Sequence, residues 1–111
     1  MSGIDKATFD ELKQISGAEF ISELIDTFLE DAPKLVEEIK SALNANHADS
    51  FRRAAHSLKS NAATFGASQL AELAKELEMM GRENWLGEAG GRLNALDEAV
   101  KSACDELRGL K

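Results

Sequence analysis

The segment FISELIDTFLEDAPKLVEEIKSAL, residues 20–43, decides the fold class of this chain. Its apolar residues recur at intervals of three and four, which is the spacing of one face of an α-helix. That face comprises Phe20, Ile21, Leu24, Ile25, Phe28, Leu29, Ala32, Leu35, Val36, Ile39 and Leu43. The segment therefore predicts a long helix that buries one side. Because Pro33 lacks a backbone N–H, we expect a kink or a local break at that position.

The flanking sequence repeats this pattern in further amphipathic segments. We expect a short helix that begins at Thr8 and, after the long helix, a helix that Asp49 caps and that runs to about Ala63. A further helix should run from about Ala67 to Met80 and end at Gly81. A glycine-rich loop over residues 84–91 and a last helix over residues 93–107 should follow. Good helix formers dominate, and no segment alternates cleanly between apolar and polar residues. The sequence predicts a single all-α domain over residues 1–111, an antiparallel four-helix bundle with a short additional N-terminal helix.

Composition excludes several classes of function. The formal charge of −7 argues against a nucleic-acid binder and against docking on an anionic membrane. No apolar run approaches the roughly 20 residues of a membrane span, and the first residues lack the apolar stretch of a signal peptide. We therefore expect a cytoplasmic protein. The single cysteine, Cys104, excludes an internal disulfide and a multi-cysteine zinc site.

Helical geometry places His56 on the outside of its helix. Its ring lies roughly 140° from the centre of an apolar arc of the same helix at about 100° per residue. That arc contains Phe51, Ala54, Ala55, Leu58 and Ala62. The neighbours of His56 on the helix surface are two cations and two small residues: Arg52, Lys59, Ser60 and Ala63. An exposed imidazole with positive flanks and free space above it suits phosphorylation by another protein. The alternative is an ordinary surface histidine beside two ordinary cations, and helical geometry alone does not separate the two.

The stretch from His56 to Ala67, HSLKSNAATFGA, closely resembles the signature of histidine-containing phosphotransfer (HPt) domains of multistep phosphorelays. That signature is His-x-Leu-Lys-Gly followed by small residues, an apolar residue, a glycine and a leucine-rich helix. The resemblance continues through Leu70, Ala74, Leu77 and Glu78. Upstream it includes FLEDAP at residues 28–33, Leu35 and Ala54-Ala55, so that it covers roughly residues 5–108.

The resemblance implies that Nε2 of His56 accepts and donates the phosphoryl group and that Lys59 helps to hold its oxygens. Ser60 stands where the family most often has glycine, which gives the incoming partner clearance. This departure puts transfer rates and partner choice in question more than the activity itself. Glu78 and Arg82 match a polar and a basic residue that lie near the histidine in some members. The alternative for these two is a surface ion pair at positions i and i+4.

The resemblance also implies the partners. These are response-regulator receiver domains and a hybrid sensor histidine kinase, with Mg²⁺ held in the acidic pocket of the receiver. The sequence itself contains no Gly-rich ATP loop and no carboxylate cluster for a metal. We therefore expect a monomer without a cofactor or metal of its own and without autonomous kinase activity. The docking face should surround His56, with the first helix around Leu12 and Ile15 and the start of the second helix as contributors.

Two rival classes of function stay open. A non-catalytic helical adaptor would bind partners through an amphipathic groove, and replacement of His56 would leave its signalling intact. A metal-binding bundle would need inward-facing Glu-x-x-His pairs, and the sequence contains none.

Overall fold

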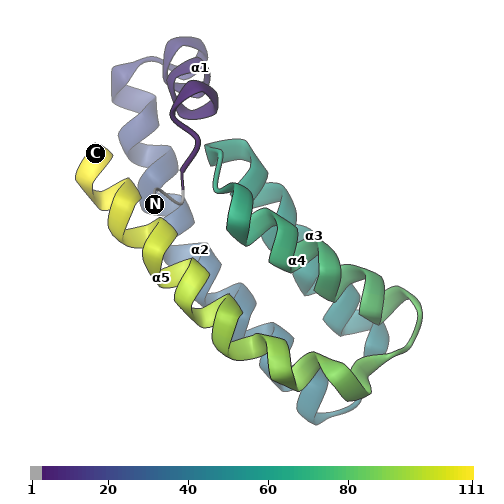
Figure 1. Ribbon diagram of the computed structural model, residues 1–111. Coiled ribbons are helices and arrows are strands. Elements are labelled where there is room, and N and C mark those ends of the chain that lie inside the picture. Colours follow the sequence, from purple (N-terminus) through teal and green to yellow (C-terminus); the bar gives the residue numbers. More distant parts are fainter. Residues whose placement is uncertain (1–3) are drawn as a thin grey trace.

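Five α-helices and one 3₁₀ helix occupy most of residues 4–111, which the computed structural model describes (Figure 1). The elements are α1 (Lys6–Ser16), α2 (Ala18–Asn44), α3 (Ala48–Phe65), α4 (Ser68–Arg82), η1 (Leu86–Arg92) and α5 (Leu93–Leu110). These residues contain no strand, so the all-α prediction is confirmed for them. Residues 1–3 of the predicted domain lie outside the described part of the chain.

The long helices lie along one another in an elongated molecule of 42 × 24 × 19 Å. Helix α3 packs against α4 and α2, while α5 packs against α2 and α4 (Figure 1). Helix α1 sits at one end, in contact with α2 and α3. Its start is attached there because the backbone N–H of Asp5 donates to the carbonyl of Gly66 at 2.6 Å. Because α1 is attached at this end of the molecule, it leaves most of α3 and α4 uncovered.

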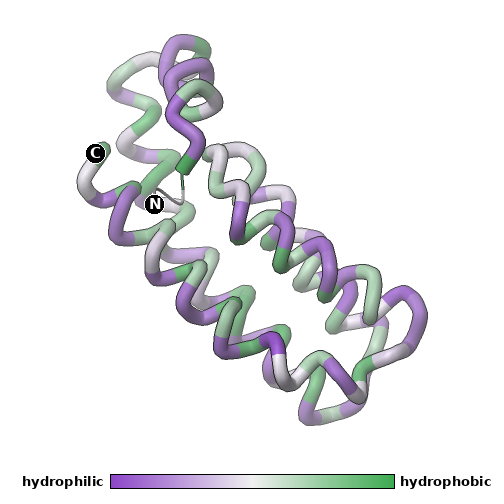
Figure 2. The backbone as a smooth tube through the Cα atoms, in the orientation of Figure 1, coloured by the Kyte–Doolittle hydropathy of each residue, from purple (hydrophilic) through white to green (hydrophobic). Residues whose placement is uncertain are grey.

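The core is built from the inward faces of the four long helices. Its largest fully buried side chains are Ile25, Phe28 and Ile39 of α2, Phe51 and Leu58 of α3, Leu70 and Leu77 of α4, and Leu96 and Leu107 of α5. Each such side chain contributes about 1.5–3 kcal/mol on removal from water. Figure 2 shows apolar and polar residues interspersed along every long helix, as amphipathic packing requires. The core thus holds α3 and α4 in a fixed relation.

For the first half of the chain, the structure excludes a break at Pro33 and places the start of the first helix earlier than expected. Helix α2 continues through Pro33 without a break. Ala32 and Val36 are buried on either side of the exposed proline, so the helix is packed on the core both before and after Pro33. Helix α1 begins before Thr8, whose hydroxyl donates to the carboxylate of Asp5 at 2.6 Å.

The predicted ends of α3 and α4 also need correction. Asp49 does not cap α3; His47 does, and its Nδ1 accepts from the backbone N–H of Ser50 at 3.3 Å. Gly66 ends α3 as expected, in a left-handed conformation with φ 78°. Gly81 does not end α4 but lies buried within it. The predicted loop over residues 84–91 is largely the 3₁₀ helix η1.

None of the helices within residues 4–111 has the length and apolar character needed to cross a membrane.

Candidate functional site

His56 lies near the middle of α3, on the side away from the core. Phe51 and Leu58 of the same helix are fully buried, whereas 55% of the His56 side chain is exposed. The prediction that this imidazole faces solvent is confirmed. The ring is therefore accessible to a second protein.

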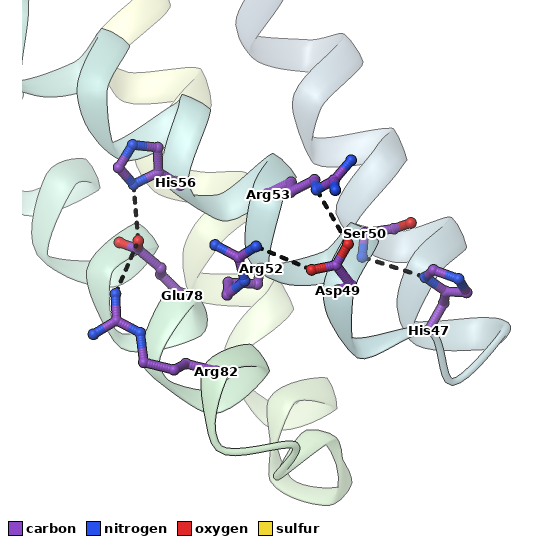
Figure 3. A network of polar contacts seen from close by, with 8 residues as sticks. All are labelled: His47, Asp49, Ser50, Arg52, Arg53, His56, Glu78 and Arg82. Carbon is purple, nitrogen blue, oxygen red and sulfur yellow. Dashed lines mark hydrogen bonds and ion pairs between the residues drawn. The ribbon is translucent and has the colours of Figure 1, made fainter.

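One carboxylate of α4 contacts two residues of α3. Oε2 of Glu78 lies 2.8 Å from Nδ1 of His56, and Oε1 lies 2.6 Å from Nζ of Lys59. An ionised carboxylate only accepts hydrogen bonds, so Nδ1 of a neutral His56 carries the ring proton. Figure 3 shows the second ring nitrogen pointing away from Glu78. The arrangement leaves the Nε2 lone pair free and directed outward.

Glu78 is the buried charged residue of this site, with 4% of its surface exposed. Hydrogen bonding from the Lys59 ammonium is the main cause that holds the pKa of Glu78 below its ordinary value of 4.5. The contact with His56 acts in the same direction, and desolvation opposes both. Glu78 is therefore an anion at neutral pH, and its charge is shared between Lys59 and His56.

Two arginines flank this cluster in different ways (Figure 3). Arg82 extends from α4, with its guanidinium 3.7 Å from Oε2 of Glu78. Arg52 is held by Asp49, whose Oδ1 accepts from it at 3.0 Å, while Oδ2 of Asp49 binds Arg53 at 3.1 Å. Chiefly because of the hydrogen bond from Arg52, the pKa of Asp49 lies below its ordinary value. Positive charge thus surrounds His56 even though the whole chain is acidic.

The small residues predicted for the site are exposed on α3. Ser60 and Ala63 lie one and two turns after His56 and carry little side-chain bulk. At the junction of α1 and α2, Ile15 is 86% and Phe20 is 62% exposed. Leu12, also named for docking, is partly buried against the core. The structure thus separates partly buried Leu12 from the two exposed apolar residues near that junction.

Glu78 lies close to His56, as the family resemblance implies, and the alternative of an ordinary surface pair with Arg82 is excluded because Glu78 is buried. The burial of Glu78 and its contact with Lys59 were not predicted. The signal was present, because Glu78 follows Ala74 by four residues and adjoins Leu77, both of which are buried. A carboxylate within the inward stripe of a helix needs partners across the interface. Asp49, which holds Arg52, was mistaken for a helix cap. No group of three or more potential metal ligands occurs within residues 4–111.

Comparisons with known proteins agree with this geometry. The model of the Hpt domain family matches residues 23–109, which is most of the chain. Histidine-containing phosphotransfer protein B (HptB) from Pseudomonas aeruginosa PAO1 is 26% identical, with a TM-score of 0.90. The alignment covers 96% of this chain and 92% of that protein. The comparison with curated proteins found no match. The chain belongs to the Hpt domain family and has a histidine phosphotransfer role in a phosphorelay.

Proposed function

We propose that His56 is the residue that carries the phosphoryl group, and that Nε2 is its attacking atom. The observation that supports this most strongly is the contact of Nδ1 with Glu78, which leaves Nε2 unprotonated and outward. In the forward step, the Nε2 lone pair attacks the phosphorus of an aspartyl phosphate. The N–P bond forms as the P–O bond breaks, and the aspartate carboxylate leaves. The Nδ1 proton stays in place throughout, hydrogen-bonded to Glu78.

Glu78 stabilises the charge that develops on the ring. A ring phosphorylated at Nε2 and protonated at Nδ1 carries positive charge, which the adjacent carboxylate offsets. The same interaction is present in both directions, in keeping with a reversible carrier. Glu78 does not touch the phosphorus, so we place it as a positioning and charge-stabilising residue.

Lys59 and the two arginines supply positive charge for the phosphoryl oxygens. The Lys59 ammonium has three donors and uses one on Glu78, and 31% of its side chain is exposed. Arg82 is 68% exposed and free to turn toward the oxygens. Arg52 would have to leave Asp49 to reach them, which makes it the weaker candidate of the three. Ser60 and Ala63 leave space for the partner, and the Ser60 hydroxyl is a further donor.

The partners in this proposal are receiver domains of response regulators and of a hybrid sensor kinase. They supply the aspartyl phosphate and the Mg²⁺, while this chain supplies the nucleophile and binds no cofactor. It acts as a phosphotransfer intermediate without kinase activity of its own, as a cytoplasmic monomer. Exposed Ile15 and Phe20 extend the docking face beyond His56. In this proposal, α2 to α5 form an antiparallel four-helix bundle, and α1 covers one end.

Replacement of His56 tests the proposal. A receiver domain labelled with phosphate on its aspartate is mixed with wild-type protein or with His56→Gln, and the label on each chain is measured. We expect label on the wild type and none on His56→Gln. His47→Gln, which removes the other histidine, is the matched control and should be labelled normally.

Equal labelling of His56→Gln and wild type would show that another residue carries the group. ATP without a receiver should label neither protein. A non-catalytic adaptor predicts a different result, in which His56→Gln binds the receiver and sustains signalling as well as the wild type does.

A further inference from the structure

Gly81 lies inside α4 and is buried against the backbone of α3. A Cβ atom at this position would fall 2.9 Å from Cβ of Arg52 and 3.0 Å from both its Cα and its backbone N. Such distances are shorter than real side-chain contacts, and backbone atoms cannot rotate away as the end of a side chain can. The glycine therefore permits a close approach of α4 to α3.

Backbone conformation does not explain this glycine. Gly17 and Gly66 have positive φ values, whereas Gly81 is an ordinary helical residue. Glycine is among the least favourable residues in a helix interior, and alanine is the most favourable. At Gly81, the close contact with Arg52 is what excludes the larger residue.

The helix register connects this contact to the functional site. Arg52 precedes His56 by four residues, and Gly81 follows Glu78 by three. The pairs Arg52–Gly81 and His56–Glu78 are thus successive contacts of two helices that run in opposite directions. At 1.5 Å per residue they are only about 4.5–6 Å apart along the helix axes. A helix is stiff over one turn, so a displacement of α4 at Gly81 moves Glu78 as well.

We propose that Gly81 is a positioning residue for phosphoryl transfer. By letting α4 approach Arg52, it places the Glu78 carboxylate within hydrogen-bonding distance of both His56 and Lys59. It does so without touching the reacting atoms. This inference rests on the function proposed above, because it assigns to Gly81 the geometry that keeps Nε2 of His56 available.

Gly81→Ala is the test, with two readouts. The first is the ¹⁵N signals of the His56 ring, which report which nitrogen carries the proton and need no partner. The second is the rate of phosphoryl transfer from a labelled receiver domain. We expect a shift of the ring signals toward a tautomer mixture and a fall in rate of about 10- to 100-fold, since small misplacements of a reacting group have effects of this size. The His47 signals should not change.

Two controls separate positioning from general loss of stability. Gly87→Ala adds a methyl group where nothing lies within 4 Å and should match the wild type in both readouts. Leu107→Ala removes a fully buried side chain of α5. It should lower the melting temperature at least as much as Gly81→Ala while leaving the His56 ring signals unchanged.

The higher helix propensity of alanine offsets part of the steric cost, so we expect Gly81→Ala to fold. The double variant Gly81→Ala/Arg52→Gly removes the nearest atom at 2.9 Å and should restore part of the wild-type ring signals. The inference is overturned if folded Gly81→Ala matches Gly87→Ala in both readouts. When the single variant does not fold, it is overturned if the double variant folds without recovering any of the wild-type ring signals. If wild type accepts no phosphoryl group, the proposed function fails, whereas the ring signals still decide whether Gly81 positions Glu78.

Discussion

At each of two helix interfaces in this molecule, a lysine pairs with a carboxylate of the facing helix. The two pairs have different consequences for fold and function. Between α3 and α4, Nζ of Lys59 lies 2.6 Å from Glu78, whose side chain is 5% exposed. Between α2 and α5, Nζ of Lys40 lies 3.0 Å from Asp97, whose side chain is 45% exposed. The two lysines are equally exposed, at 31% and 33%. The interfaces therefore differ mainly in the burial of the carboxylate.

That difference indicates what each pair does. An ion pair open to water contributes about 0–1 kcal/mol and does little more than join two helices. A buried carboxylate loses hydration, and its pairing often only compensates for that loss. Burial of Glu78 is thus a poor way to stabilise the fold. It is an effective way to hold an anion at a fixed distance from the imidazole of His56, where hydration would weaken the interaction.

Of the changes to these two pairs, Glu78→Met should produce the largest effect, and on function rather than on stability. We expect transfer to His56 to slow by at least about tenfold, since a hydrogen bond to a charged group contributes about 1.5–3 kcal/mol. The free energy of unfolding should stay within about 1 kcal/mol of wild type or rise, because a packed apolar side chain replaces a desolvated charge. Lys59 and His56 both reach water, so neither is left buried without a partner.

Transfer kinetics and chemical denaturation of the same preparations measure both quantities. Glu78→Gln, which keeps an oxygen for Nδ1 of His56 but loses the charge, should fall between wild type and Glu78→Met in transfer rate. Strong destabilisation of Glu78→Met with unchanged transfer would assign Glu78 to the fold instead.

Acidic pH should separate wild type from Glu78→Met in a second way. The pKa of Glu78 is lowered in the folded protein, so the unfolded state binds a proton more readily. This contribution to stability is complete well above the ordinary value of 4.5 and is lost as the pH falls from there through the lower folded value. In a pH series that descends from neutral pH through 4.5, wild type should therefore lose more stability than Glu78→Met.

Denaturation midpoints of the two proteins across this pH series measure the difference. The lowered pKa of Asp49 acts equally in both proteins and cancels in the comparison. Parallel pH curves would contradict the charged, paired state assigned to Glu78.

The two interfaces also show which features of the fold and of the site the sequence predicts. Apolar periodicity predicts the helices and the exposure of His56, since both depend on position along one helix. The contact of Glu78 with Lys59 and His56 depends on how α4 lies on α3. Nothing in the spacing of one helix gives that register. The unbroken helix at Pro33 and the cap of α3 were not predicted for a related reason, because local rules for breaks and caps gave way to core packing around Ala32 and to the cap supplied by His47.

Asp97→Asn should give the smallest effect. Nearly half of the Asp97 side chain is exposed, so water replaces Lys40 as its partner at little cost. We expect the free energy of unfolding to change by less than about 1 kcal/mol, and less in high salt than in low salt, as for an exposed ion pair. Transfer to His56 should match wild type. Denaturation at two salt concentrations measures the first effect, and the receiver assay measures the second. A loss of transfer in Asp97→Asn would mean that the α2–α5 interface also sets the geometry of His56. The Lys59–Glu78 pair could then no longer be assigned to function and the Lys40–Asp97 pair to the fold alone.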